Sequence, residues 1–256
     1  MSISHHIHAF SVPKYGHKER ENEDAVAFDA QAGWLAVADG ATEASYSREW
    51  AEILAESIST ATKKPGNIKE RMLERLIPSR RLGSMVADLQ QKWYDQVPWD
   101  RLEDLGWLFV EKAQQGALAT FLAVRIEEQK WAAIGIGDCN LFIVGKNGIV
   151  KLSVPAETAD EFGTSPSLVP SMPGPQVKQA LSSLWRKTGK WQPDESLIVC
   201  TDAVAAYLLY AVEKDASIME RLLAIESTKE FAHWVQGARS TGMRNDDATV
   251  ALVTQA

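Results

Sequence analysis

The feature that most constrains this chain is a short apolar run that ends in an Asp-Gly pair. Residues 34–38 read Trp-Leu-Ala-Val-Ala, and Asp39 and Gly40 follow directly. The run has the length of a buried strand, so Asp39 is predicted where that strand leaves the core. Gly40 permits a sharp turn with an unobstructed carbonyl, and a carboxylate beside a carbonyl oxygen suits Mg²⁺ or Mn²⁺. Taken alone, the stretch is better explained as an ordinary turn after a strand.

Acidic residues mark the ends of several other predicted strands. They are Glu23 and Asp24, Asp138, Asp202, and Asp246 with Asp247. A hairpin of residues 23–28 and 34–38 would place both Glu23 and Asp24 level with Asp39, because antiparallel neighbours run in opposite directions. Clustered carboxylates repel one another, and a pair of divalent cations offsets that cost. Such a pair also activates water for attack on phosphorus, so the pattern predicts phosphate-ester hydrolysis, with solvated acidic turns as the alternative.

The composition limits the classes of partner. The chain has 256 residues, of which 45% are hydrophobic and 24% charged, as in ordinary globular proteins. Its net charge of −7 argues against a nucleic-acid partner, because such proteins carry a basic face. No apolar run approaches the roughly 20 residues of a membrane-spanning helix, and the N-terminus lacks the apolar core of a secretory signal. We therefore expect no membrane partner, a cytoplasmic location, and buried thiols at Cys139 and Cys200.

Hydrophobic periodicity predicts strands and helices within one domain, residues 1–256. Strands are expected at residues 4–12, 23–28, 34–38, 117–126, 131–136, 141–144, 149–154, 196–200 and 250–253. Helices are expected at residues 45–60, 68–93 with a break or kink at Pro78, 204–211, 218–225 and 231–239. Residues 116–154 are predicted to form one antiparallel meander, and residues 177–191 a strand or hairpin. Residues 155–175 contain five prolines and are predicted to be a long irregular segment, which in such cases is often functional.

Six short motifs follow one another along the chain, and each is weak by itself. They are residues 22–25 (Asn-Glu-Asp-Ala), 37–40 (Val-Ala-Asp-Gly), 116–120 (Gly-Ala-Leu-Ala-Thr), 135–139 (Gly-Ile-Gly-Asp-Cys), 200–203 (Cys-Thr-Asp-Ala) and 245–249 (Asn-Asp-Asp-Ala-Thr). In this order and spacing they resemble the motifs of the metal-dependent protein phosphatases of type 2C, the PPM family, and most closely its compact bacterial branch. The resemblance runs through almost the whole chain.

The resemblance implies an α+β fold, a four-layer α-β-β-α sandwich of two antiparallel sheets flanked by helices. It implies a protein serine/threonine phosphatase that hydrolyses phosphoserine and phosphothreonine with two Mn²⁺ or Mg²⁺ ions and without a phosphoenzyme intermediate. The expected partner is a phosphoprotein substrate, whose phosphorylation by a serine/threonine kinase the enzyme opposes. Both metals take oxygen ligands, so the sequence does not choose between them.

The resemblance also implies a role for the residues of the motifs in binding metal. Asp39 would bridge the two ions. Asp202 and Asp246 would bind one of them. The carbonyl of Gly40 and, directly or through water, Glu23 would bind the other. The predicted centre is therefore assembled from segments that lie far apart in the sequence.

Catalysis and phosphate binding follow from the same resemblance. Asp24 would orient a metal-bound water beside the bridging Asp39. Many family members hold the substrate phosphate with an arginine five residues before the second acidic residue, where this chain has Glu19. Arg20, or Lys18, is the expected substitute from an adjacent position.

Several residues of this chain depart from the family motifs. Residues 41–43 are Ala-Thr-Glu where glycines are usual, Ala203 replaces the glycine of Thr-Asp-Gly, and Asp247 replaces the closing asparagine. The aspartate that binds a third metal in many members has no clear match, and residues 155–175 occupy the place expected for it and for the flap. Two alternatives therefore stay open. One is a phosphatase fold that has lost catalysis and binds a partner, and the other is a plain globular α+β protein with solvated acidic turns.

Overall fold

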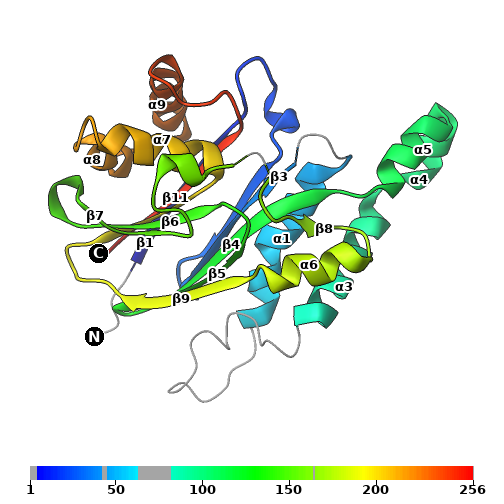
Figure 1. Cartoon of the computed structure of the whole chain (residues 1–256), viewed down its shortest axis with the longest axis horizontal. Coiled ribbons are helices and arrows are strands. Elements are labelled where there is room, and N and C mark those ends of the chain that lie inside the picture. The colour runs from blue at the N-terminus through cyan, green and yellow to red at the C-terminus, as the bar shows by residue number, and fades with distance from the viewer. Residues whose placement is uncertain (1–4, 42–44, 63–81, 164, 256) are drawn as a thin grey trace.

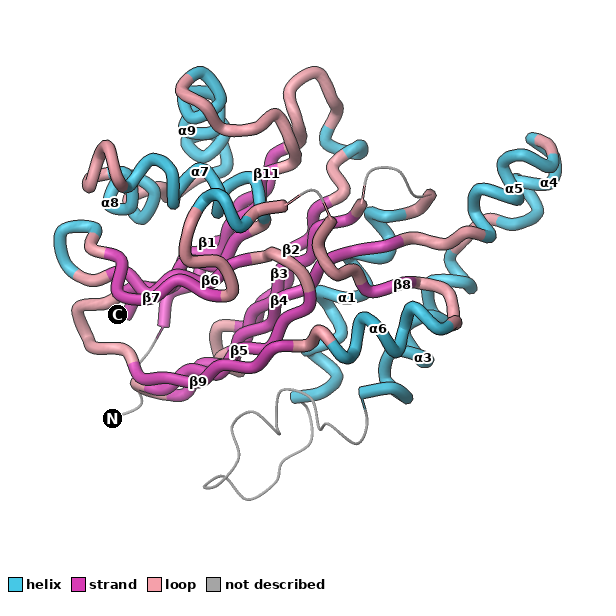
Figure 2. Tube along the Cα trace, in the orientation of Figure 1, coloured by secondary structure: helices cyan, strands magenta, loops and turns pink. Residues whose placement is uncertain are grey.

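The computed structural model describes residues 5–41, 45–62, 82–163 and 165–255 (Figure 1). Within them, two antiparallel sheets lie face to face between layers of helices (Figure 2). This arrangement confirms the predicted four-layer α-β-β-α sandwich. Part of the expected helix over residues 68–93, including Pro78, lies outside the described residues. In the described part of the chain, every helix is too short or too polar to cross a membrane.

Two strand orders define the sheets. The first sheet has the order β1-β11-β10-β6-β7, and the second has the order β2-β3-β4-β5-β9, with the short β8 paired to β4. The strands of the first sheet are β1 His5–Val12, β6 Asn140–Val144, β7 Val150–Val154, β10 Ser196–Cys200 and β11 Ala248–Gln255. Those of the second sheet are β2 Asp24–Asp29, β3 Trp34–Gly40, β4 Leu118–Glu127, β5 Lys130–Ile136, β8 Val169–Pro170 and β9 Trp185–Lys190.

The helices form two outer layers and one projecting hairpin. The layer on the first sheet contains α7 Asp202–Val212, α8 Ile218–Leu223 and α9 Thr228–Ser240. The layer on the second sheet contains α1 Ser47–Thr62, α3 Leu82–Gln96 and α6 Pro175–Ser182. The sequence pattern of residues 98–110 favours no structure, and this region contains α4 Trp99–Leu105 and α5 Trp107–Gln114. Figure 1 shows these two helices projecting from one side of the sandwich.

Strand β3 illustrates how the sequence determines which layer each face of a strand contacts. Leu35 and Val37 are fully buried between the two sheets. Ala36 and Ala38 point the other way and pack with Trp50 of α1, because alternate residues of a strand face opposite sides. Their small side chains let α1 lie close to the sheet. Burial of each large apolar side chain contributes about 2 kcal/mol, so this alternation fixes which face of β3 meets the other sheet.

The predicted meander over residues 116–154 is wrong at one connection. The β4–β5 hairpin belongs to the second sheet and the β6–β7 hairpin to the first. The chain crosses between the sheets at residues 137–139, where Gly137 has a φ of +92°. Strands β5 and β6 are buried on both faces, so their residue pattern does not tell which sheet each one joins.

For residues 177–191, the strand is confirmed, of the two predicted alternatives, as β9. Helix α6, in which the segment starts, is not predicted from the sequence. Pro175 is the first residue of α6, a position where proline is favoured because its missing N–H has no partner to lose. The two cysteines behave as expected: Cys139 and Cys200 are free and buried, and burial raises the pKa of each thiol.

Candidate metal centre

A pair of carboxyl groups lies at the end of the β2–β3 hairpin. Asp24 and Asp39 are direct partners in this antiparallel ladder, as the sequence predicts. Leu35 and Val37 point between the sheets, so Asp39, two residues further along the strand, points there as well. Asp24 shares that face because opposed residues of a ladder lie on the same side. The hairpin therefore presents both carboxyls at one end of the space between the sheets.

The other sheet reaches this pair through Thr201, which follows β10. Its Oγ1 donates to Asp24 Oδ2 at 2.8 Å and accepts the Thr249 N–H at 3.1 Å. Asp202 begins α7, and Asp246 lies two residues before β11. Since β10 and β11 are antiparallel neighbours, the end of one lies beside the start of the other. The two sheets thus bring Asp202 and Asp246 to the same end as the hairpin carboxyls.

The acidic groups at this end act on one another. Burial raises the pKa of Asp39 well above its ordinary value, and four neighbouring carboxylates raise it further, those of Asp24, Asp202, Asp138 and Asp246. Burial is also the main cause that raises the pKa of Asp24. Burial and the charge of Asp202 raise the pKa of Asp138 to about 6. This is the electrostatic behaviour of a cluster whose negative charge is not fully compensated.

One guanidinium partly compensates that charge. Arg244 Nη2 donates to Asp202 Oδ2, and Arg244 Nε lies 3.6 Å from Asp246 Oδ2. Burial lowers the pKa of Arg244, but the carboxylates of Asp202, Asp246 and Asp39 outweigh this effect and raise it overall. Arg244 therefore links two carboxylates that the family resemblance assigns to one metal ion.

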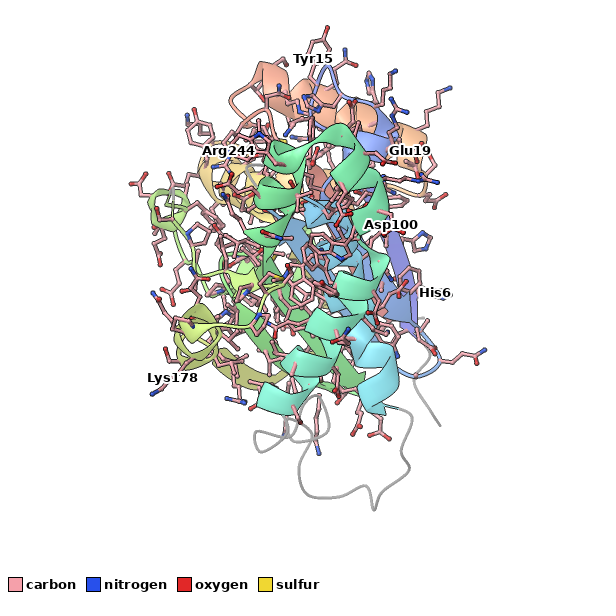
Figure 3. All side chains as sticks on the ribbon, turned by 90° about the vertical axis from the view of Figure 1, so that its right-hand side faces the viewer. His6, Tyr15, Glu19, Asp100, Lys178 and Arg244 are labelled. Atoms are coloured by element: carbon pink, nitrogen blue, oxygen red, sulfur yellow. The ribbon has the colours of Figure 1, made fainter. Side chains whose placement is uncertain are left out.

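The loop before β2 is tied to the start of β11 by Asp247. Its Oδ1 accepts the Lys14 N–H and its Oδ2 accepts the Glu23 N–H, both at 2.7 Å. Lys14 Nζ lies 3.9 Å from Glu23 Oε2, so a second cation meets a carboxylate predicted to bind metal. Figure 3 places Tyr15 of this loop and Arg244 toward the same end of the molecule. Asp247 thereby holds Glu23 close to the centre.

Gly40 has a different structural role from the predicted sharp turn. It is the last residue of β3, and its N–H donates to the Glu23 carbonyl at 3.2 Å. A Cβ at this position would lie 2.8 Å from the Glu23 carbonyl oxygen and 2.9 Å from that of Ser47. Glycine is required because it allows this close approach of backbone segments. The predicted turn at Gly40 is therefore wrong, and the residue serves close packing beside the centre.

The two candidate phosphate-binding residues have different surroundings. Arg20 and Glu23 line one cavity of about 370 Å³ together with Lys14, His17 and Arg48. Lys18 is absent from the described lining of that cavity. The structure therefore places Arg20, rather than Lys18, in the same cavity as a predicted metal ligand.

The oxygen donors at this end fit a hard divalent cation. Carboxylate and carbonyl oxygens are the ligands of Mg²⁺ and Mn²⁺, and buried neighbouring carboxyls with raised pKa values are stabilised by such an ion. Asp138 Oδ1 is buried without a hydrogen-bond partner among the described residues. In the ranges that the structure describes, no three Asp, Glu, His or Cys side chains stand close enough together to hold a metal ion as they are. Arg244 contacts Oδ2 of both Asp202 and Asp246, so it competes with a metal ion for these oxygens.

Sequence patterns do not predict the cations of this centre. Lys14 and Arg244 lie in polar loops, where periodicity carries no information about long-range contacts. The one available signal is that Arg244 precedes Asp246 by two residues. The pattern does place Asp138 at a strand end, but gives it no part in the group around Asp39.

Comparison with known proteins identifies relatives of this fold. A family model described as protein phosphatase 2C matches residues 15–246. The structure resembles the catalytic domain of the serine/threonine protein phosphatase PstP in complex with two manganese ions, with a TM-score of 0.66 and 14% identity over 100% of both chains. It also resembles PstP/Ppp of Mycobacterium tuberculosis, with a TM-score of 0.62 and 15% identity over 98% of each chain. PppA, described as a regulatory component of T6SS in Pseudomonas aeruginosa, gives a TM-score of 0.63 and 15% identity over 100% of each chain.

Comparison with curated protein sequences gives no match. At such low identities the solved structures support the fold alone, whereas the family model covers most of the sequence, including the acidic residues from Glu23 to Asp246. The expected resemblance to the PPM family and to its compact bacterial members is thereby confirmed. The chain belongs to the protein phosphatase 2C family.

Proposed function

We propose that this protein hydrolyses phosphoserine and phosphothreonine on proteins with two Mn²⁺ or Mg²⁺ ions. The observation that carries the proposal is the convergence of carboxylates from both sheets at one end of the sandwich, where burial and then the neighbouring carboxylates raise the pKa of Asp39. When bound, the divalent ions supply an activated water and neutralise charge on the phosphoryl oxygens. The substrate is a phosphoprotein, and a serine/threonine kinase catalyses the opposing reaction.

Residues from both sheets would bind the metal ions and orient the attacking water. Asp39, Asp202, Asp246, Glu23 and the Gly40 carbonyl would provide the oxygen ligands for the metal ions. The hydrogen bond from Thr201 fixes the Asp24 carboxyl, which would orient the attacking water. These roles assign metal binding to residues of both sheets, so the geometry of the centre depends on how the two sheets pack.

The cavity beside Glu23 is the proposed site for the substrate phosphate. Arg20, Lys14, His17 and Arg48 give it four basic side chains against the carboxylates of Glu21, Glu23 and Glu49. Arg20 is the residue that we assign to the phosphate, because an arginine can donate two parallel hydrogen bonds to phosphoryl oxygens.

Mn²⁺ titration and phosphopeptide hydrolysis test this function together. The wild type is expected to bind Mn²⁺ in calorimetry and to hydrolyse a phosphothreonine peptide and p-nitrophenyl phosphate. Asp39→Asn and Asp202→Asn should lose both properties, whereas Asp100→Asn, an exposed position on α4, should retain them. Undiminished activity in either of the first two variants would refute the metal assignment.

A second candidate function is a phosphatase-fold protein that binds a partner without turnover. The ion pairs of Arg244 with Asp202 and Asp246 favour it, because they occupy carboxylates needed for metal. Mn²⁺ binding without hydrolysis of phosphopeptides or p-nitrophenyl phosphate would support this candidate over the first.

A further inference from the structure

The projecting hairpin of α4 and α5 (Figure 1) exposes hydrophobic side chains where the two helices meet. Nine large hydrophobic side chains are exposed in the ranges that the structure describes, and four of them lie within five consecutive residues: Leu105, Trp107, Leu108 and Phe109. We call these four residues the hairpin tip. Single exposed apolar side chains are common on protein surfaces, but a contiguous group of them marks an interaction site. The hairpin tip is therefore a surface suited to contact with another molecule.

Other residues of the hairpin attach it to the core. Leu102 of α4 and Ala113 of α5 are buried and belong to the hydrophobic cluster between the second sheet and its helices. The indole N–H of Trp99 donates to the Tyr94 carbonyl at 2.9 Å, which ties the start of α4 to α3. The hairpin tip takes no part in this core, so polar substitutions there should leave the fold intact.

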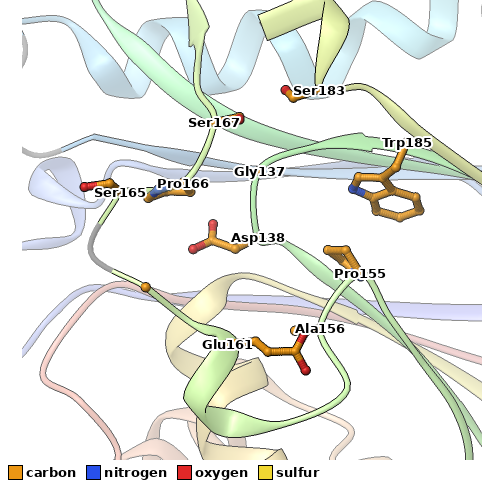
Figure 4. A pocket seen from close by; sticks show the side chains of 11 residues that line it. Gly137, Asp138, Pro155, Ala156, Glu161, Ser165, Pro166, Ser167, Ser183 and Trp185 are labelled. Carbon is orange, nitrogen blue, oxygen red and sulfur yellow. The ribbon is translucent and has the colours of Figure 1, made fainter.

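The hairpin joins the sandwich beside the proposed metal centre. Residues 115–117 connect α5 to β4, and Ala119, near the start of β4, pairs with Gly40. The start of β4 also pairs with β8, and the segment before β8 lines the cavity of the centre at Asp138 (Figure 4). Three connecting residues span at most about 10 Å and α5 is about 12 Å long, so the hairpin tip lies within about 30 Å of Gly40. A protein bound at the centre is large enough to reach the hairpin tip.

The charge around the hairpin tip is negative. Residues 94–114 contain five carboxylates and two cations, and all five carboxylates are exposed. A partner whose apolar side chains are flanked by lysine or arginine complements this surface. The anionic surface of a membrane would instead be repelled by it. The charge therefore favours a basic protein segment over a lipid surface as the occupant.

The hairpin tip is too small for a stable dimer of this chain. Its four side chains are 50–76% exposed, which corresponds to an area on the order of 400 Å². An obligate dimer buries more than about 1,000 Å² on each chain, whereas transient complexes bury less. An apolar area of this size fits a contact that forms and dissociates during turnover, as the contact with a substrate must.

We propose that the hairpin tip docks the phosphoprotein substrate through a segment of apolar and basic side chains that is separate from the phosphorylated residue. This inference rests on the proposed function. An extended peptide advances about 3.3 Å per residue, so a distance of about 30 Å places the docking segment up to about nine residues from the phosphorylated residue. Binding at the hairpin tip raises the effective concentration of the phosphate at the centre without adding a contact there.

A phosphothreonine peptide that carries a second segment tests this docking. A flexible linker of about twelve residues joins the peptide to a segment of leucine and lysine, of leucine and glutamate, or of serine and lysine, placed before or after the phosphothreonine. With Mn²⁺, kcat/KM should be about tenfold higher for the leucine–lysine segment than for the other two in at least one placement, through a lower KM. The double variant Trp107→Ser/Leu108→Ser should bring the three values within about twofold of one another, because it removes the apolar contact. Its hydrolysis of p-nitrophenyl phosphate should equal that of the wild type.

Ile149→Ser is the matched control. Ile149 is 53% exposed between β6 and β7 of the first sheet, so its variant should keep the preference for the leucine–lysine segment. Equal values for the three segments in the wild type would overturn the proposal, as would a preference that survives in the double variant or falls equally in the control. Slower hydrolysis of p-nitrophenyl phosphate by the double variant would also overturn it, because the hairpin would then act on the centre itself.

Two measurements identify other occupants. A dimer in analytical ultracentrifugation that the double variant abolishes would assign the hairpin tip to a second copy, and binding to phosphatidylserine vesicles that the double variant abolishes would assign it to a membrane; either result overturns the proposal. If no phosphate ester is hydrolysed, the proposed function fails separately. Fluorescence anisotropy with the unphosphorylated leucine–lysine peptide then decides: tighter binding to the wild type than to the double variant supports docking at the hairpin tip, and equal affinity overturns it.

Discussion

Replacement of Asp138 by asparagine should stabilise the metal-free protein at neutral pH. Burial is the first cause that raises the pKa of this carboxyl, and the negative charge of Asp202 is the second. Both causes disfavour the ionised form in the folded state. Asparagine has nearly the same shape and no charge, so it removes this cost while leaving the connection between β5 and β6 in place.

The size of the effect follows from the pKa. The folded protein holds the Asp138 proton with a pKa of about 6, against an ordinary value of 3.8. Because the folded state binds the proton more tightly, its stability falls as pH rises through this interval and is then constant. At pH 7.5 the cost of ionisation is about 3 kcal/mol, and at pH 4.5 it is about 1 kcal/mol. Asp138→Asn should therefore raise the free energy of unfolding by up to about 3 kcal/mol at pH 7.5, and by about a third as much at pH 4.5.

Urea unfolding in the presence of a chelator measures this difference. Wild type and Asp138→Asn are unfolded at pH 4.5 and at pH 7.5, and Asp100→Asn on α4 serves as the control that removes an exposed charge. The control should change the free energy of unfolding by less than about 0.5 kcal/mol at either pH. An equal gain for Asp138→Asn at both pH values, or a loss at pH 7.5, would show that uncompensated charge is not what destabilises this end of the sandwich.

Three further changes test the surroundings of the centre. Gly40→Ala should lower the free energy of unfolding by about 2 kcal/mol in urea, because its Cβ would meet the Glu23 and Ser47 carbonyl oxygens at 2.8 and 2.9 Å; no loss would contradict this. Arg244→Gln should lower the Kd for Mn²⁺ about fivefold in calorimetry, because it frees the carboxylates of Asp202 and Asp246. Weaker Mn²⁺ binding would show that Arg244 does not compete with the metal ion for these carboxylates. Arg20→Gln should raise the KM for a phosphopeptide about fivefold while Lys18→Gln leaves it unchanged, and equal effects would contradict the cavity assignment.

Within one hairpin, the sequence is sufficient to predict the site. The two apolar runs of β2 and β3 and the break between them fix an antiparallel pair, and the pairing of Asp24 with Asp39 follows. The period of two along β3 also fixes the direction of Asp39, because Leu35 and Val37 must be buried on the same side. Local pattern and burial determine this half of the centre completely.

The sequence is not sufficient to predict the contacts that join the two sheets at the site. Strands β5, β6 and β10 are apolar on both faces, so the pattern does not specify which sheet each joins or which neighbour each pairs with. The hydrogen bond from Thr201 to Asp24 depends on those choices, and so does the approach of Asp202 to Asp39. The family resemblance predicts this convergence, while periodicity does not. Loop contacts such as that of Arg244 have no periodic signal at all.

Two departures from the family motifs have local structural causes. Ala203 is the second residue of α7 and is buried, and alanine favours a helix over glycine by about 1 kcal/mol. Asp247 accepts two backbone N–H groups, from Lys14 and Glu23, with separate oxygens, which the single carbonyl oxygen of an asparagine side chain would have to share. Each substitution strengthens the framework around a predicted metal ligand, Asp202 in the first case and Glu23 in the second. These departures therefore fit an active centre as well as an inactive one, and they give no reason to prefer the partner-binding candidate.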